Sequence, residues 1–327
     1  MKVGFRCSEG GPVFDEALAQ AEYAEELGFD SVWVAEHHGW DAFWPSSHLA
    51  LAGIATRTTD IELGTSVTLL PQANPVRLAG EIALLDQIAD GRVTLGVGVG
   101  WRRPEMENLG YEFESRGPRM TEHLRTLRQL WRKETVSMDG EFVTLSDFSL
   151  SPRPVQDPHP PVWVGGDVDV SLKRAARLGE AWVPVWRMSI DELAERFDRY
   201  ESYVRAAGDD PADRQRPLMR SAWISEDTGD AEAEMKAMFR RLIESYREMG
   251  AGAYEPLERA IESDFRSFAE DRFIYGSPAD CARQLDRYEQ ELGPDHLILK
   301  LANPGVSHER ILRFLELFGD EVLPTVA

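Results

Sequence analysis

Cysteine, lysine and long apolar runs are all scarce in this chain of 327 residues. The two cysteines, Cys7 and Cys281, lie near opposite ends of the sequence and fit no metal-ligand spacing, which favours reduced thiols. No apolar run approaches the roughly 20 residues that a membrane-spanning helix needs. The first residues enter a strand-like run with no signal peptide before it. We therefore expect a cytoplasmic protein with no membrane partner.

Basic charge is scarce as well. The chain has 57 acidic and 36 basic residues, a formal net charge of −21, and only five of the basic residues are lysines. Such a surface repels nucleic acid and anionic lipid, so we exclude both as partners. The composition is typical of a halophilic protein, whose self-repulsion is screened by cytoplasmic salt. A mesophile with a GC-rich genome would also prefer arginine to lysine.

Short apolar runs alternate with amphipathic helices along the whole chain. Strands are expected at 2–5, 31–36, 61–67, 93–99, 162–164, 181–185, 218–224 and 296–299. The helices between and after them are expected at 14–27, 47–57, 75–89, 117–132, 168–178, 190–206, 230–248, 278–292 and 307–318. Eight strand–helix units without a break in the middle predict an α/β fold, a single (β/α)8 TIM barrel that spans residues 1–327 as one domain.

Three segments exceed the minimal barrel and are expected as insertions, mainly after strands 4 and 7: about 101–116, 146–160 and 249–275. The second is rich in proline and should be an extended loop. The third has weak periodicity and is expected as a mobile cover. Just before the second, Asp139-Gly140 between two short apolar runs predicts a hairpin with a two-residue turn.

The second strand ends in Glu36-His37-His38. Active sites of TIM barrels lie at the carboxyl ends of the strands, and a histidine there is suited to acid–base catalysis because its pKa lies near neutrality. We therefore assign His37 as the candidate catalytic residue, with His38 as its support and Glu36 on the cofactor side. The alternative is a histidine bonded to a nearby carbonyl. A metal shared by His37 and His38 is disfavoured because adjacent strand residues point to opposite faces.

Two glycine-rich strand ends are candidate cofactor sites. Gly96–Gly100 lacks the third glycine of a dinucleotide loop, because Trp101 and Arg103 stand where it is required. Gly98 and Gly100 either let a flat ring approach the backbone or merely ease packing. Gly165-Gly166-Asp167 runs into a helix, whose N-terminal N–H groups form a natural phosphate site, or an ordinary βα turn. No P-loop, Gly-x-Ser-x-Gly elbow or cysteine cluster is present.

Together these segments resemble the luciferase-like family of flavin- and deazaflavin-dependent oxidoreductases over nearly the whole chain. The longest similar run covers 64–100, including Gly64-Thr65-Ser66-Val67 and Leu85-Asp86-Gln87-Ile88-Ala89-Asp90-Gly91-Arg92. Shorter pieces are Gly28–Trp33, Glu36-His37-His38 and Gly276–Cys281.

The resemblance implies roles for individual residues. His37 would act near the reactive ring atoms, and Ser66–Val67 would carry a non-prolyl cis peptide under the ring. Further residues would bind the cofactor phosphate: Gly165, Gly166, Asp167, Val168 and Ser171. The chain departs from luciferase at Asp167-Val168, and at Gly98 and Val99, where luciferase has a reactive cysteine and a phosphate-binding arginine. The region from Gly96 through Glu105 to Gly117 is more similar to members that use coenzyme F-420.

The cofactor is therefore expected to be reduced FMN or the deazaflavin F-420, and the substrate a small, largely apolar molecule. Reduced FMN reacts with oxygen and needs a dry site, which would make 249–275 a lid. Reduced deazaflavin transfers hydride, and His37 would then donate a proton or polarise the substrate. A homodimer through the second and third helices is also implied. The alternatives are a flavin-binding barrel without turnover and a metal-dependent hydrolase using His37, His38 and His48.

The halophilic interpretation gives a first prediction. The melting temperature should rise between low salt and molar KCl, because the salt screens repulsion among the acidic side chains. Thermal unfolding followed across a KCl series measures this. A melting temperature that stays level or falls would contradict the interpretation.

Overall fold

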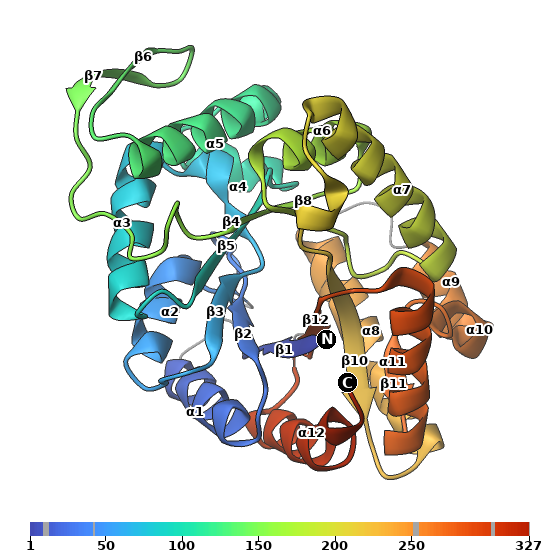
Figure 1. Ribbon diagram of the computed structural model, residues 1–327. Helices are drawn as coiled ribbons and strands as arrows, with labels where there is room; N and C mark the ends of the chain where they lie inside the picture. Colours follow the sequence, from blue (N-terminus) through green and yellow to red (C-terminus); the bar gives the residue numbers. More distant parts are fainter. Residues whose placement is uncertain (9–12, 42, 251–254, 302–304, 327) are drawn as a thin grey trace. The chain divides into compact units, whose positions relative to one another are not determined.

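The computed structural model describes residues 1–8, 13–41, 43–250, 255–301 and 305–326 (Figure 1). The chain divides into two compact units. Unit 1 consists of Met1–Trp33, Pro184–Arg199 and Gln215–Ala327. Unit 2 consists of Val34–Val183 and Tyr200–Arg214. Each unit is built from parallel strands and the helices that follow them.

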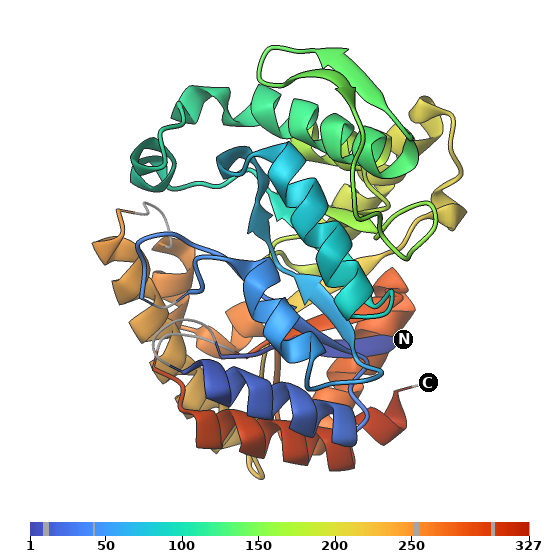
Figure 2. The same ribbon diagram turned by 90° about the vertical axis from the view of Figure 1, so that its left-hand side faces the viewer.

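Unit 1 contains a run of parallel strands in the order β11-β10-β12-β1-β2. Their bounds are β1 Lys2–Arg6, β2 Ser31–Val34, whose last residue belongs to unit 2, β10 Pro217–Ile224, β11 Ile274–Gly276 and β12 His296–Lys300. The helices are α1 Phe14–Glu26, α8 Thr228–Glu248, α9 Glu255–Glu262, α10 Phe265–Ala269, α11 Pro278–Leu292 and α12 His308–Glu321, with the short η4 Leu323–Thr325. Figure 2 shows α1 and α12 side by side, as their contacts require.

Unit 2 contains parallel strands in the order β3-β5-β8-β9, with β4 also paired to β5. The strands are β3 Glu62–Thr65, β4 Thr68–Leu69, β5 Val93–Gly98, β8 Val162–Gly165 and β9 Ala181–Val183. The helices are α2 Ser47–Ala55, α3 Pro75–Ile88, α4 Arg103–Asn108, α5 Arg116–Arg132 and α6 Asp169–Leu178, with the short η1 Leu70–Gln72, η2 Phe113–Ser115 and η3 Pro211–Asp213. Helix α7, Ile190–Ala207, contributes to both units.

The predicted alternation of strand and helix is confirmed: each of the eight expected strands is present, and each is followed by a helix. The second strand is shorter than expected, because it ends at Val34 and Glu36 instead forms an isolated bridge with Trp44. The segment 249–275 holds α9, α10 and β11, which pairs with β10. The apolar pattern missed these elements because β11 has only three residues. Residues 251–254 of the expected cover lie outside the described residues.

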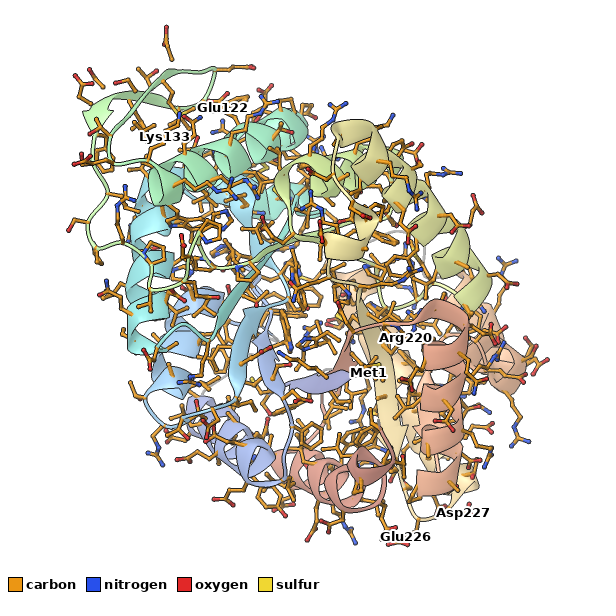
Figure 3. The ribbon with its side chains drawn as sticks, in the orientation of Figure 1. Met1, Glu122, Lys133, Arg220, Glu226 and Asp227 are labelled. Atoms are coloured by element: carbon orange, nitrogen blue, oxygen red, sulfur yellow. The ribbon has the colours of Figure 1, made fainter. Side chains whose placement is uncertain are left out.

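The predicted hairpin is confirmed, but its turn lies further along the chain. Strands β6 Val136–Asp139 and β7 Thr144–Phe148 are antiparallel, and the Gly140 N–H donates to the Val143 carbonyl at 3.0 Å. The carboxylate of Glu122 on α5 accepts three backbone N–H groups, those of 141, 142 and 143 (Figure 3). These hydrogen bonds hold the turn at residues 141–142, whereas the Asp-Gly signal predicted it at residues 139–140.

Across the described part of the chain, no helix combines the length and the apolar character that crossing a bilayer would require. Both cysteines, Cys7 and Cys281, are buried thiols, and neither is in a disulfide.

A buried polar relay crosses the strands of unit 1. The Trp33 Nε1–H donates to Ser31 Oγ at 2.7 Å, and Ser31 Oγ lies 2.7 Å from Nε2 of His296 on β12. Burial lowers the pKa of His296 to about 3. The ring is therefore neutral at pH 7, and its Nε2 can accept the serine hydroxyl proton.

The relay predicts acid sensitivity. Because the folded pKa of His296 lies below its unfolded value, its stabilising contribution is complete above about pH 6.5 and is lost as the pH falls towards about 3. His296→Gln keeps an acceptor for Ser31 and does not titrate. Between pH 6.5 and pH 4 it should lose about 3 kcal/mol less unfolding free energy than the parent chain. Urea unfolding at several pH values measures this, and equal losses in both proteins would contradict it.

Candidate active site

The predicted site residues all lie in unit 2, and the buried carboxylate of Glu36 connects three of its segments. At the start of α2, the carboxylate accepts hydrogen bonds from the Ser47 N–H at 3.1 Å and from the Ser47 hydroxyl at 2.9 Å. On β4, it accepts a hydrogen bond from the Leu69 N–H at 3.2 Å. Burial opposes ionisation, but the nearby His38 ring and the hydrogen bonds from Ser47 and Leu69 outweigh it and lower the pKa of Glu36. Glu36 therefore braces the site, and its contact with a cofactor stays a prediction.

His38 faces Glu36, not His37. Its Nε2 lies 3.7 Å from Glu36 Oε1, and this carboxylate raises the pKa of His38. The side chain of His38 is thus turned to Glu36, and its support of His37 stays a prediction. The segment stays extended through the bridge between Glu36 and Trp44, and adjacent residues of an extended segment point to opposite sides, so the two rings reach different carboxylates.

His37 is held by Glu105, a residue outside the predicted site. The His37 Nδ1 atom lies 3.1 Å from Glu105 Oε2, and the Glu105 side chain is completely buried. The same carboxylate accepts the backbone N–H of His38. A carboxylate at Nδ1 fixes the ring tautomer and leaves Nε2 as the exchangeable position, as acid–base histidines require. Sequence reasoning missed this role because it read 101–116 as an insertion.

The sequence does contain a signal for Glu105. Helix α4 starts after Arg102 with Pro104 in its first turn, where proline is favoured, and Glu105 follows in that turn. A carboxylate is stabilised there by the helix dipole. A short helix after a glycine-rich barrel strand, with a carboxylate in its first turn, is therefore a pattern that could have identified this residue.

Aromatic rings surround His37. The ring centroids of Phe43, Trp40 and Trp101 lie 4.7, 5.3 and 6.0 Å from that of His37. Their packing lowers the access of water to His37, whose side chain is 11% exposed. An acid–base group with such walls suits a substrate with an apolar body.

The expected non-prolyl cis peptide is present between Ser66 and Val67. The glycines of the neighbouring strands pack against Val67. A Cβ at Gly98 would lie 2.6 Å from Val67 Cγ2, and one at Gly165 would lie 3.5 Å from Val67 Cγ1. The sequence left two interpretations open for Gly98: access for a flat ring, or packing between strands. The close approach of Val67 supports the packing interpretation. Contact between a ring and the backbone at this glycine stays a prediction.

The Gly165–Ser171 turn leads into α6. Gly166 has a φ of +143°, and a Cβ there would lie 2.5 Å from Ser171 Oγ, so only glycine fits. The Ser171 hydroxyl donates to the Val168 carbonyl at 2.6 Å and accepts the Val168 N–H at 3.2 Å. The Trp182 Nε1–H donates to the Gly166 carbonyl at 2.7 Å. The turn is therefore rigid, and phosphate binding by Asp167 and its neighbours stays a prediction.

One orphaned polar atom shows how a flavin-type ring fits. The buried side-chain oxygen of Gln72, just after β4, has no hydrogen-bond partner among the described residues. A Cβ at Gly100, where φ is +76°, would come within 2.9 Å of Gln72 Nε2. The ring N–H groups of flavins and deazaflavins are donors for such an oxygen. The residues present therefore fit the ring of either cofactor.

The histidines named for a metal-dependent hydrolase do not converge. His37 faces Glu105, His38 faces Glu36, and His48 Nε2 lies 3.1 Å from Glu81 Oε2. Within the described ranges, no group of three or more histidine, cysteine, aspartate or glutamate side chains could hold a metal ion.

Glu105 gives a testable prediction. Glu105→Ala leaves the His38 N–H and His37 Nδ1 without their buried acceptor and should lower the free energy of unfolding by about 1–3 kcal/mol. Glu107→Ala is the matched control on α4, because the Glu107 carboxylate is half exposed and pairs with the exposed Arg103. It should change stability by less than about 0.5 kcal/mol. Urea unfolding measures both. Similar effects of the two substitutions would contradict the assignment.

The chain is similar to known proteins over nearly its whole length. The chain is 26% identical over 328 residues to the oxygenase component of flavin-dependent trigonelline monooxygenase from Acinetobacter baylyi, covering 95% of this chain and 89% of that protein. It is 27% identical over 339 residues to the F420-dependent glucose-6-phosphate dehydrogenase of Amycolatopsis mediterranei, covering 99% and 98%. One of these relatives is flavin-dependent and the other is F420-dependent.

The fold is similar to that of monooxygenase RslO1 from Streptomyces bottropensis, with a TM-score of 0.86 and 25% identity over the whole of both chains. An F420-dependent secondary alcohol dehydrogenase shares the fold at a TM-score of 0.81 and 22% identity, over 100% of this chain and 99% of that one. The predicted fold class is thereby confirmed. The family described as luciferase-like monooxygenase matches residues 2–296. The chain therefore belongs to the luciferase-like family of flavin- and F420-dependent oxidoreductases.

Proposed function

We propose that this protein transfers two electrons between a flavin-type coenzyme and a small, largely apolar organic substrate, with His37 as the acid–base group. The observation that carries the proposal is the buried Glu105 carboxylate, 3.1 Å from His37 Nδ1 and within the aromatic walls. A histidine with one ring nitrogen held by a carboxylate is built for proton transfer at the other. A protein that only bound the coenzyme would not need this arrangement.

In this mechanism His37 Nε2 takes or gives the substrate proton. Glu105 holds the tautomer and stabilises the charged ring when the proton arrives. Trp40, Phe43 and Trp101 exclude water and receive the apolar part of the substrate. When bound, a flavin or deazaflavin supplies the hydride chemistry that no protein side chain can provide.

Several residues would hold the coenzyme. The Gln72 side-chain oxygen would accept a ring N–H, and Ser66, Val67, Gly98 and Gly100 would line the ring. The Gly165–Val168 turn and Ser171, at the start of α6, would receive the phosphate. Asp169 is an acidic residue in the first turn of that helix, so the phosphate end is less electropositive than a helix start alone would be.

Of the two cofactors, we favour coenzyme F-420. Hydride transfer to or from a carbonyl or alcohol needs a coupled proton, and the His37–Glu105 pair supplies that function directly. The second candidate is an FMN-dependent monooxygenase. The dry aromatic surroundings of His37 favour it, since oxygen chemistry must be shielded from water.

A cofactor titration tests the proposal. We expect the apoprotein to quench the fluorescence of reduced FMN or F-420 saturably, and binding of neither would contradict the proposal. His37→Ala should keep that affinity and lower turnover of a panel of small alcohols and ketones by about 10²–10⁴-fold. A flavin-binding protein without catalysis would show no turnover to lose, so a zero rate in the parent chain with full cofactor binding would favour that alternative.

We also propose a homodimer through α2 and α3. Leu49 on α2 is 70% exposed, and Leu84 and Ile88 on α3 are 50% and 43% exposed. The two helices are in contact and lie on the side turned to the viewer in Figure 2. A groove of about 970 Å³ between α3 and the β6–β7 hairpin, lined in part by Leu84 and Phe142, extends this apolar area. Apolar side chains gathered on one side favour burial against a partner.

Sedimentation velocity tests the dimer. The parent chain should sediment as a dimer at micromolar concentration, and Leu84→Glu as a monomer, because a charge would be buried in the interface. Leu109→Glu is the control, since Leu109 is 42% exposed after α4, away from both helices. A monomeric parent chain, or dissociation by both substitutions alike, would overturn this proposal.

The two buried thiols, neither of them in a disulfide, support our further proposal that the protein works in the cytoplasm. Adaptation to salt is likewise a proposal, supported by the net charge of −21.

A further inference from the structure

Strand β10 carries a buried arginine that faces the helices of unit 1. Arg220 is 0% exposed, and its guanidinium lies 5.0 Å from the ring centre of Tyr288 on α11 (Figure 3). Its register partner on β12 is Leu299, whose own partner on β1 is Phe5. Register partners point to the same face of a sheet, so the neighbours of Arg220 on these strands are apolar. The position is unusual, because charged side chains are almost never fully buried unless they are paired.

The guanidinium is not neutralised by a carboxylate in contact with it. Within the described residues, Arg220 forms no ion pair. The charge of Glu192 acts on it from beyond contact distance, but that carboxylate accepts the Ser189 N–H at 2.7 Å, lies 3.8 Å from Arg272 and is 58% exposed. Burial lowers the pKa of Arg220, yet a guanidinium stays protonated in proteins. Unit 1 therefore contains a buried positive charge without a contact partner of opposite sign.

The hydrogen bonds of this guanidinium use only one of its sides. Nη1 donates to the backbone carbonyls of Trp186 at 3.3 Å and of Met219 at 3.2 Å. Nε and Nη2 are buried and have no hydrogen-bond partner among the described residues. These two nitrogens carry parallel N–H groups along one edge of the planar group, which is the fork that binds an anion in a bidentate pair. The two unused donors of Arg220 therefore point to one place.

The orientation of the guanidinium is fixed from its other side. The Trp186 ring stacks on Phe239 and Phe273, with ring centres 5.6 and 6.0 Å apart. The carbonyl that holds Nη1 thus belongs to a packed segment of unit 1. The edge formed by Nε and Nη2 consequently keeps its direction.

Tyr288 adds a third donor beside this edge. Its side chain is 1% exposed, and its hydroxyl has no hydrogen-bond partner among the described residues. Burial raises the pKa of Tyr288, and the nearby guanidinium opposes that rise. The hydroxyl is therefore protonated at neutral pH. Because a guanidinium has no acceptor, the hydroxyl proton can be received only by another group.

A small anion satisfies all of these groups together. A buried polar group without a partner commonly marks the place of a water molecule or an ion. Water would accept hydrogen bonds here but would leave the positive charge unbalanced, and buried charges are stable only when they are paired. An anionic group carried by a larger molecule cannot reach Arg220, which is fully buried. The arrangement therefore suits a monatomic or similarly small anion.

We propose that Arg220 and Tyr288 bind an inorganic anion of the size of chloride between β10 and α11. Nε and Nη2 of the guanidinium would give two charge-assisted hydrogen bonds, and the Tyr288 hydroxyl would give a third. The anion would bind the folded chain and not the unfolded one, and would thereby stabilise the fold. Both residues belong to unit 1, whereas the predicted catalytic and coenzyme-binding residues belong to unit 2, so this inference does not depend on the proposed function.

Thermal unfolding of the full chain in potassium chloride and in potassium gluconate, at equal ionic strength, tests the site. Screening of the acidic surface is the same in both salts, whereas gluconate is too large for an enclosed site. The melting temperature should be higher in chloride by about 2–5 °C once chloride is about 100-fold above its dissociation constant, and the difference should saturate. Equal melting temperatures in the two salts overturn the inference.

Variants locate the anion. Arg220→Met should abolish the difference between the salts, and it should fold, because replacing a buried charge by an apolar side chain is often neutral or stabilising. Tyr288→Phe loses only the hydroxyl and should reduce the difference, which keeps the test valid if Arg220→Met does not fold. Arg313→Met is the matched control, because Arg313 is exposed on α12, and it should keep the full difference. A full difference in Arg220→Met or in Tyr288→Phe overturns the inference.

Anomalous diffraction from crystals of the full chain soaked in bromide, an analogue of chloride, gives a readout that does not depend on stability. We expect a peak beside Nε and Nη2 of Arg220 in the parent chain and none in Arg220→Met. Electron density without an anomalous peak would identify a water molecule and overturn the proposal. A bromide peak without any difference in melting temperature between the two salts would indicate an adventitious ion only, and would overturn it as well.

Discussion

The candidate site depends on one constraint, the need to satisfy a buried carboxylate at Glu36. An ionised carboxylate away from water is tolerated only when donors surround it, and here the donors come from Ser47 and Leu69, with His38 nearby. They belong to the start of α2 and to β4. Since β4 begins directly after Val67, the same carboxylate also anchors the chain beside the cis peptide. Segments far apart in sequence are thus fixed at one point.

A second buried carboxylate, that of Glu105, positions the candidate catalytic residue His37. Glu105 takes both the His37 ring and the His38 backbone N–H, so it holds the segment after β2 from the other side. Two adjacent histidines consequently have different environments. The carboxylate facing His38 raises its pKa, while His37 is placed among aromatic rings. This separation leaves His37, and not His38, among the aromatic rings, and it directs the two imidazoles to different points.

The glycines of this chain illustrate how one residue type serves different needs. Gly98 is required because Val67 fills the space where a Cβ would stand, and Gly166 because its φ is +143° with Ser171 directly beside it. Both lie at strand ends where a flavin-type ring and its phosphate are expected. Packing and cofactor access are therefore compatible explanations for these glycines, since a glycine that packing requires also leaves space for a cofactor.

Much of this protein was predictable from local sequence. Strand and helix periodicity is a property of neighbouring residues, so the alternating elements, the helix that starts at Pro75 and the barrel class followed directly. The roles of the Glu36-His37-His38 segment and of Ser66–Val67 were also predicted from the sequence, because both belong to the segments that resemble the family.

Contacts between distant residues could be decided only by the tertiary structure. The carboxylate of Glu105 reaches His37 across 68 positions, Glu122 relocates a turn that the Asp-Gly signal placed elsewhere, and Arg6 meets Lys300 because β1 pairs with β12. A local pattern marks at most one member of such a pair, as the first turn of α4 marks Glu105, and the pairing itself forms only when the fold brings distant segments together. The sequence thus determined which helices and strands form, and the tertiary structure determined which distant side chains make hydrogen bonds or packing contacts.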